Sequence, residues 1–210
     1  MSLPGGITAR IILVRHGEPV QSAQGRCYGK LDVSLSQRGE RQIEQTARWL
    51  QKFEIDAIYA SPRTRAVESG KIIAAKRRLL IQPDESFAEI NFGDFEGRTY
   101  EEVEHQFPEI YQKWMTTPTL VKFPNGESFS EMQARVLAAI RALKIRHQGE
   151  TFGIVSHGGV NRIVLADALK MPEAEIFRLE QSYAATNVID FYDDFPVLRI
   201  LNRTNEISWR

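Results

Sequence analysis

Short runs of apolar residues along the chain predict β-strands. Residues 11–14 are four consecutive aliphatic residues, and a run without polar alternation is typical of a strand buried on both faces of a parallel sheet. Three further runs predict strands: 57–60, 79–81 and 151–156. Nearer the C-terminus, residues 187–192 and 197–201 also have strand character, and the segment 193–196 between them indicates a hairpin.

Amphipathic segments between these runs predict helices. Ser36 is a typical N-cap, and the helix that it begins is expected to reach about Phe53. Ile43, Ala47 and Leu50 follow the spacing of one buried helix face. Strands that alternate with such helices indicate an α/β fold with a mostly parallel sheet.

Two other helices have recognisable starts. Ser61 is expected to cap a helix with Pro62 in its first position, which places Arg65 in the first turn. Ser128 and Glu131 form the Ser-x-x-Glu capping box of another helix. The methionine and aliphatic stripe of this second helix belongs to the hydrophobic core.

Residues 84–127 differ from the rest of the chain. The segment is rich in aromatic residues, is interrupted at Pro108 and Pro118, and holds ten acidic and three basic residues, a net charge of −7. The formal charge of the whole chain is zero, so the remainder carries +7. An irregular segment inserted between strands is typical of a lid that contributes substrate specificity. We therefore expect one domain over residues 1–210, with a lid-like insertion at about 84–127.

The composition excludes several classes of protein. Acidic and basic residues balance at 27 each, so nothing indicates a nucleic-acid partner. A single cysteine, Cys27, excludes an internal disulfide and a cysteine-based zinc cluster. No apolar stretch approaches the length of a transmembrane helix, and the first six residues have no signal-peptide character. We expect a cytoplasmic protein without a membrane partner.

The residues that follow two predicted strands have the chemistry of phosphate binding. Arg15 and His16 come directly after residues 11–14, and ligands of open α/β sheets bind at this edge. The planar guanidinium of Arg15 suits phosphate, and a neutral histidine can attack phosphorus. Arg65 follows the strand at 57–60, beside a helix N-terminus that favours anions.

The strand at 151–156 repeats the same arrangement. His157 and Gly158 follow it, and another amphipathic segment begins at Val160. A histidine at a helix N-terminus can hydrogen-bond a phosphoryl oxygen.

The sequence gives weaker support for a phosphate-binding role of the remaining arginine and histidine candidates. The loop at residues 20–35 contains glycines that let backbone N–H groups approach an anion, and Arg26 adds charge there. His105 and His147 lie in charged helical contexts, so both are expected at the surface.

Three carboxylates between residues 87 and 97 are candidates for a proton donor. Glu89 lies among apolar and aromatic residues, and desolvation favours the protonated form of a carboxyl group in such surroundings. That form would suit protonation of a leaving oxygen. Asp94 and Glu96 compete for the role, and the local sequence does not separate the three.

Four segments together resemble the histidine phosphatase superfamily, whose fold is phosphoglycerate-mutase-like. They are 13–18 (Leu-Val-Arg-His-Gly-Glu), 61–66 (Ser-Pro-x-x-Arg-Ala), 89–97 (Glu-x-x-Phe-Gly-x-x-Glu-Gly) and 156–159 (Ser-His-Gly-Gly). They occur in the order and near the spacings of the family. The resemblance implies a three-layer α/β/α sandwich with a mostly parallel central sheet.

The resemblance also implies roles for the motif residues. His16 would be the nucleophile and would form a phosphohistidine, and Glu89 would protonate the leaving group and then activate water. This assignment selects Glu89 among the three carboxylates. The phosphate-binding residues would be Arg15, Arg65, His157, Gly158 and Arg26. No metal or other cofactor is required.

The sequence also differs from the commonest pattern of the family. Pro19 stands where Thr or Ser often occurs, and Ser22 stands where many members have an Asn that contacts phosphate. These differences leave the Arg, His and Glu set intact and affect the outer phosphate contacts.

The segment around Glu89 and the compact lid resemble the phosphatase branch, in which water accepts the phosphoryl group. A cofactor-dependent phosphoglycerate mutase is the alternative. Residues 25–33 are similar to α-ribazole-5′-phosphate phosphatases, which makes α-ribazole 5′-phosphate a candidate among small phosphorylated metabolites, beside sugar or nucleotide phosphates. A non-catalytic phosphate-binding or interaction module is the alternative of another class. The sequence does not determine the oligomeric state, and a homodimer is one of the states that it allows.

Overall fold

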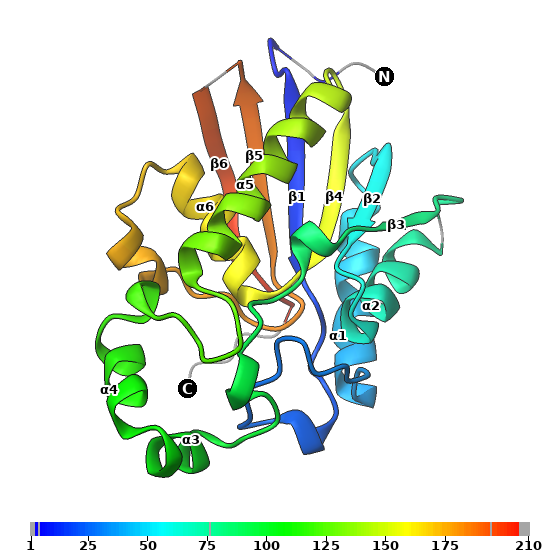
Figure 1. Cartoon of the computed structure of the whole chain (residues 1–210). Helices are drawn as coiled ribbons and strands as arrows, with labels where there is room; N and C mark the ends of the chain where they lie inside the picture. Colours follow the sequence, from blue (N-terminus) through cyan, green and yellow to red (C-terminus); the bar gives the residue numbers. More distant parts are fainter. Residues whose placement is uncertain (1–2, 4, 76, 194, 206–210) are drawn as a thin grey trace.

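A six-stranded sheet forms the centre of the protein in the computed structural model, which describes residues 3, 5–75, 77–193 and 195–205 (Figure 1). The strands are β1 (Ala9–Arg15), β2 (Ala57–Ala60), β3 (Ile81–Pro83), β4 (Thr151–Ser156), β5 (Thr186–Tyr192) and β6 (Phe195–Arg203). Their order across the sheet is β3-β2-β4-β1-β5-β6. The first four strands pair in parallel, and β5 and β6 add antiparallel pairs. The mostly parallel sheet expected from the sequence is confirmed.

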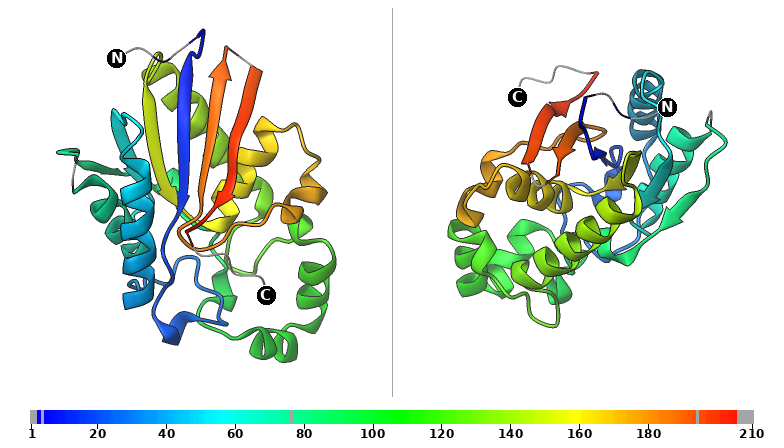
Figure 2. Two further views of the ribbon diagram at one scale, coloured as in Figure 1. Left: turned by 180° about the vertical axis from the view of Figure 1, so that it is seen from behind. Right: turned by 90° about the horizontal axis from the view of Figure 1, so that it is seen from above.

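Helices cover both faces of the sheet, which gives three layers (Figure 2). One face carries α1 (Gln37–Leu50) and α2 (Thr64–Ala74), and the other carries α5 (Phe129–Arg146) and α6 (Gly158–Ala168). Successive strand residues point to opposite faces, so Ile12 packs in the cluster that contains Ile43 of α1, whereas Leu13 packs in the cluster that contains Met132 of α5. The three-layer prediction is confirmed.

Two helix boundaries differ from the prediction. α1 begins after the Ser36 cap as expected but ends at Leu50, three residues before Phe53. α2 begins at Thr64 rather than directly after Ser61, and its N-cap position has no side-chain cap. Instead, the carboxylate of Asp32 accepts hydrogen bonds of 2.7 Å from both the backbone N–H and the hydroxyl of Thr64. A residue from a distant loop therefore stabilises the helix start that local sequence would have placed earlier.

The third strand is also displaced from its predicted position. β3 covers residues 81–83 instead of 79–81, and Ile81 pairs with Ile58 of β2. Leu80 is 87% exposed, so it lies outside the sheet although it is apolar. The C-terminal hairpin is longer than predicted, because β5 begins at Thr186 and β6 reaches Arg203. Asp194 of the expected turn lies outside the described residues.

His147 was expected at the surface, and this prediction is wrong. His147 is buried at the end of α5, where its Nε2 lies 2.9 Å from the hydroxyl of Tyr59 and its Nδ1 lies 2.7 Å from the carboxylate of Glu150. Its ring also packs against Phe152. Its sequence neighbours Arg146 and Gln148 are exposed, so local composition did not reveal the burial of His147. His105 is exposed, as predicted.

The segment that precedes α5 forms α3 (Tyr100–Gln106), α4 (Pro108–Thr116) and short 3-10 turns, beyond the carboxyl end of β1 (Figure 1). Aromatic side chains hold it together, with Trp114 in contact with Phe92, Phe95 and Phe123.

In the described part of the chain, no helix is both long and apolar enough to cross a membrane.

Candidate functional site

The register of the two central strands brings the two motif histidines together. β1 and β4 are parallel neighbours, and Arg15 is paired with Ser156, so His16 and His157 are the next residues at the same sheet edge. The backbone N–H of His16 donates to the carbonyl of Ser156 at 2.9 Å. The imidazole centroids are 5.1 Å apart, and both side chains are buried. Segments 141 residues apart in the numbering thus form one site.

The surroundings of His16 keep its ring neutral and fix its tautomer. Nδ1 lies 2.7 Å from the carbonyl oxygen of Gly17, and because a carbonyl can only accept, Nδ1 carries the proton. Nε2 then has a free lone pair. Burial lowers the pKa of His16 well below its ordinary value, and the charges of Arg65 and Arg15 lower it further. A neutral imidazole with an unprotonated Nε2 is the form that can attack phosphorus.

Arg65 is fully buried and anchored by the loop that follows residue 27. Its Nη2 donates to the carbonyls of Tyr28 and Gly29 at 2.9 and 3.0 Å, and its Nη1 donates to the carbonyl of Leu31 at 3.0 Å. Arg15 is anchored differently, with Nη1 on the carbonyl of Gln181. Neither guanidinium forms an ion pair among the described residues, so both retain their charge for an anion beside His16.

Three buried nitrogens near His16 have no hydrogen-bond partner in the described part of the chain. They are Nε of Arg15, Nε of Arg65 and Nδ1 of His157. The other ring nitrogen of His157 lies 2.8 Å from the hydroxyl of Ser61. Buried polar atoms without partners are costly. A phosphoryl group with three acceptor oxygens would satisfy the two guanidinium N–H groups, and also His157 in the tautomer that carries its proton on Nδ1.

Glu89 reaches the site from the segment between β3 and α3. Its Oε2 accepts a hydrogen bond of 3.2 Å from the N–H of Gly159, in the first turn of α6. A Cβ at position 159 would overlap with the Glu89 carboxylate, so glycine is required there for this approach. The backbone of the segment is held by Arg135, which donates to the carbonyl of Ser86 at 2.9 Å and forms an ion pair with Glu127.

The two competing carboxylates are used in other ways. Glu96 accepts four backbone hydrogen bonds of 2.7–3.1 Å, from Gly29, Lys30, Leu31 and Phe92. Asp94 accepts from the side-chain amide of Asn125 at 3.1 Å. Geometry therefore separates the three acids that local sequence left equal, and of these Glu89 is the one bonded to the first turn of α6.

Arg26 and Gly158 occupy different places relative to this centre. Gly158 is the first residue of α6, and a Cβ there would lie 3.6 Å from Nε of Arg15. Arg26 instead lies against the segment that leads into α3, where Nη1 donates to the carbonyl of Gly97 at 2.7 Å and lies 3.7 Å from the carboxylate of Glu102. Gly158 therefore lies beside Arg15, whereas the contacts of Arg26 are with Gly97 and Glu102.

Two tyrosines beside His16 were missed in the sequence. The ring centroids of Tyr28 and Tyr183 lie 6.4 and 5.7 Å from that of His16, and the two hydroxyl oxygens are 2.7 Å apart. The guanidinium of Arg15 stacks 4.1 Å above the ring of Tyr183. Burial raises the pKa of Tyr28, and the neighbouring Tyr183 raises it further, so the Tyr28 hydroxyl keeps its proton. The tyrosines are 155 residues apart in the chain, and no motif connects them.

Arg162 was also missed, although a sequence signal existed. It lies four residues after Gly158 on α6, and residues at this spacing share a helix face. Its Nη1 would be 3.0 Å from a Cβ at position 158. Ser61 was interpreted only as a helix cap, whereas the structure places its hydroxyl on His157.

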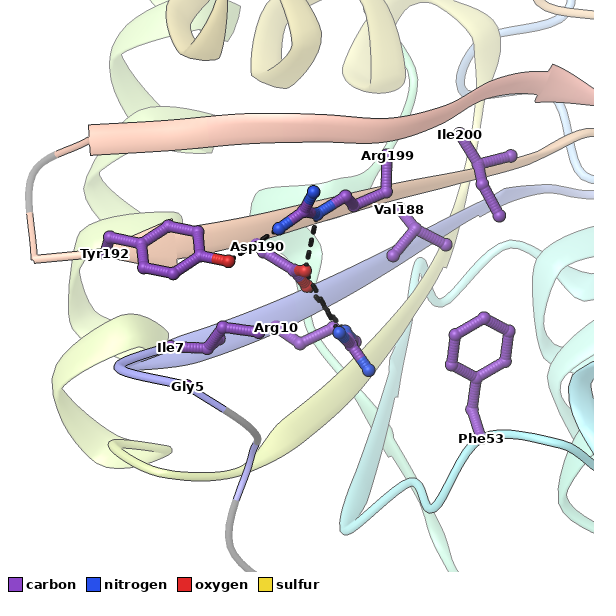
Figure 3. Close-up of a pocket in the computed structure, with 9 residues that line it drawn as sticks. All are labelled: Gly5, Ile7, Arg10, Phe53, Val188, Asp190, Tyr192, Arg199 and Ile200. Atoms are coloured by element: carbon purple, nitrogen blue, oxygen red, sulfur yellow. Dashed lines mark hydrogen bonds and ion pairs between the residues drawn. The ribbon is translucent and has the colours of Figure 1, made fainter.

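A separate hollow lies at the opposite end of β1 (Figure 3). There Asp190 is held between Arg10, at 2.5 Å, and Arg199, at 2.9 Å. Arg10 is five residues before Arg15 on an extended strand, which separates the two places by roughly 16 Å. Both arginines are paired with this carboxylate, and among the described residues none that lines the hollow has a buried side-chain nitrogen or oxygen without a partner. Within the described ranges, no group of three or more His, Cys, Asp or Glu side chains is placed to hold a metal ion.

Comparison with known proteins agrees with the geometry. The sequence profile of the histidine phosphatase superfamily, branch 1, matches residues 11–204. Phosphoserine phosphatase 1 of Hydrogenobacter thermophilus is 31% identical over 195 residues, covering 93% of this chain and 92% of the relative. Adenosylcobalamin/α-ribazole phosphatase of Salmonella typhimurium is 28% identical, covering 96% and 98%. The crystal structure of the α-ribazole phosphatase from Shigella flexneri superimposes with a TM-score of 0.84 at 28% identity, covering 92% and 96%.

Proposed function

Because the chain belongs to the histidine phosphatase superfamily, branch 1, and is a phosphatase of small phosphorylated metabolites, we propose that it acts through a phosphohistidine on His16 without a metal ion. The observation that carries this proposal is the combination of a neutral His16, whose Nε2 carries no proton, with three buried nitrogens that have no partner among the described residues. These are the requirements of a nucleophile and of a cradle for a phosphoryl group.

In the first step, Nε2 of His16 attacks phosphorus and the bond to the ester oxygen breaks. Glu89 gives its proton to the departing oxygen, which leaves as an alcohol. Arg15, Arg65 and His157 bind the phosphoryl oxygens during in-line transfer, where positioning and electrostatic stabilisation supply most of the catalysis. In the second step, Glu89 accepts a proton from water as the water attacks the phosphohistidine, and inorganic phosphate and free His16 result.

The identity of the substrate is proposed from the sequence of one loop and from the activities named for the relatives. Residues 25–33 resemble α-ribazole-5′-phosphate phosphatases, and two relatives bear that activity in their names. Another relative is a phosphoserine phosphatase. The candidates are therefore α-ribazole 5′-phosphate and phosphoserine.

The test is phosphate release in the presence of a chelator, from a panel that holds these two compounds with sugar phosphates, nucleotides and phosphoglycerates. His16→Ala is expected to lower turnover at least about 10³-fold, and mass spectrometry after an alkaline quench should detect a phosphoryl adduct on His16 in the parent enzyme. The matched control is His105→Ala, at an exposed histidine, which should keep full activity. Turnover that survives His16→Ala would contradict the proposal, as would phosphoglycerate interconversion without phosphate release, which would indicate a mutase.

A further inference from the structure

Arg162 is a cation at the catalytic edge for which the proposed mechanism has no use. It lies on α6, and its Nη1 and the Nε of Arg15 approach the same point, 3.0 and 3.6 Å from where a Cβ of Gly158 would be. Two guanidinium groups thus face one glycine at the start of the helix. Like charges this close repel each other, and an anion between them would relieve the repulsion.

The contacts of Arg162 fix its position and leave its charge unpaired. Nε donates to the carbonyl of Leu179 at 2.8 Å, and the ring of Phe177 lies 5.4 Å from the guanidinium carbon. In the part of the chain that the structure describes, no carboxylate is within ion-pair distance of Arg162, whereas nearby Arg178 is paired with Glu175. Burial lowers the pKa of Arg162 and the charge of Arg15 lowers it further, while Glu89 and Glu180 oppose this effect. The two terminal nitrogens form a preorganised fork that suits a carboxylate.

The position of Glu89 indicates which part of a substrate would meet this fork. Glu89 bonds to Gly159, and Arg162 approaches Gly158, so both border the first turn of α6. If Glu89 protonates the leaving oxygen, the leaving group lies beside Glu89. Arg162 therefore borders the leaving group, while Arg65, held by the loop at 28–31, serves the transferred phosphate.

Resting on the function proposed above, we infer that Arg162 is a specificity-determining residue that binds a carboxylate on the leaving group. The substrate class is then the phosphomonoesters of small hydroxy acids and hydroxyamino acids. This class includes phosphoserine and excludes α-ribazole 5′-phosphate, whose leaving group has no carboxylate.

The test compares 3-phosphoglycerate with glycerol 3-phosphate, which has a CH₂OH group in place of the carboxylate. The parent enzyme should prefer 3-phosphoglycerate by at least about tenfold in kcat/KM. Arg162→Met should lower kcat/KM for 3-phosphoglycerate by about 10- to 100-fold, mainly through KM, and change that for glycerol 3-phosphate by less than about threefold. Arg162→Lys, which keeps the charge without the fork, should recover part of the loss. Arg141→Met, at an exposed arginine of α5, is the matched control and should behave as the parent.

Inhibition by inorganic phosphate reports the phosphate subsite separately and should be unchanged in Arg162→Met, which also shows that the variant is folded. Equal losses on both substrates would overturn the inference, because they would make Arg162 a support for Glu89 or Arg15. A parent enzyme that releases phosphate through His16 but shows no preference for the carboxylate would also overturn it and leave the phosphatase proposal standing. Absence of His16-dependent release from every compound would instead contradict the phosphatase proposal itself.

Discussion

Glu89, Asp94 and Glu96 are chemically similar side chains whose hydrogen-bond partners give them different capacities. A carboxylate has about four acceptor positions, and backbone N–H groups occupy that number at Glu96. Glu89 accepts from the N–H of Gly159 and from its own neighbour Ile90, which leaves acceptor capacity on both oxygens. At the residue scale, the number of occupied lone pairs therefore distinguishes an acid that can serve a substrate from one that serves the fold.

Glu89→Gln should slow hydrolysis according to the leaving group. An alkyl phosphate needs protonation of its ester oxygen, so its kcat should fall about 10²–10⁴-fold, whereas an activated aryl phosphate should lose much less in the first step. Steady-state and burst kinetics on the two esters measure this difference. Asp94→Asn is the matched control and should leave both rates unchanged. Equal slowing of phosphohistidine formation from the two esters would argue against Glu89 as the acid.

At the scale of elements, the loop at residues 28–31 connects a carboxylate on one side with an arginine on the other. Its N–H groups donate to Glu96, and its carbonyls accept from Arg65. Gly29 lies so close to the carbonyl of Ile90 that a Cβ would overlap with it. The loop thus positions Arg65 through main-chain groups, and Glu96 determines the orientation of those groups.

Glu96→Gln should therefore affect both stability and phosphate binding. An amide presents its NH₂ group to N–H donors, so at least one of the four hydrogen bonds is lost, and the free energy of unfolding should fall by about 1–3 kcal/mol. The displaced loop should weaken the hold on Arg65 and raise the inhibition constant of inorganic phosphate. Urea unfolding and product inhibition measure the two effects, again with Asp94→Asn as the control. A variant with the stability and phosphate affinity of the parent would show that the loop does not depend on Glu96.

At the scale of the whole molecule, the fold buries two histidines in their neutral form. Burial is the main cause that lowers the pKa of His16 and of His157 well below the ordinary value of 6.5, and neighbouring arginines add to it. In the unfolded chain, both rings take up protons as the pH falls through about 6.5, whereas in the folded protein they do not. The folded state then binds fewer protons, so the free energy of unfolding decreases as the pH falls. The site is thus maintained at the expense of stability in acid.

Between pH 7 and pH 5.5, the free energy of unfolding of the parent should fall by up to about 2.5 kcal/mol more than that of the double variant His16→Asn/His157→Asn. The reason is that each proton bound by the unfolded chain but not by the folded protein changes the free energy of unfolding by about 1.4 kcal/mol per pH unit. Urea unfolding at several pH values measures this slope. The comparison concerns the slope, so a general loss of stability in the variant does not affect it. His105→Asn, at an exposed histidine, should keep the slope of the parent. Parallel curves for the parent and the double variant would contradict the neutral burial of the two rings.

The apolar runs and capping signals were sufficient to predict the α/β class, because burial on both faces and helix starts leave local marks on the chain. β1, β2 and β4 lie where the runs predicted them, and the capping box of α5 is present. Strand ends that are followed by arginine, histidine and glycine are local features, and they indicated His16, Arg65 and His157 as candidate site residues. Glu89 was selected among the three carboxylates only by the resemblance to the family.

Tertiary structure alone decided what depends on contacts between distant segments. Asp32 caps α2 from another loop, Tyr28 and Tyr183 meet over His16, and His147 is buried against Tyr59. The tertiary structure also determined the difference between Glu89 and Glu96, because it sets which backbone N–H groups donate hydrogen bonds to each carboxylate. Local sequence expresses propensity and pattern, whereas hydrogen-bond partners and burial are set when the chain packs, and these set the protonation and charge on which the chemistry depends.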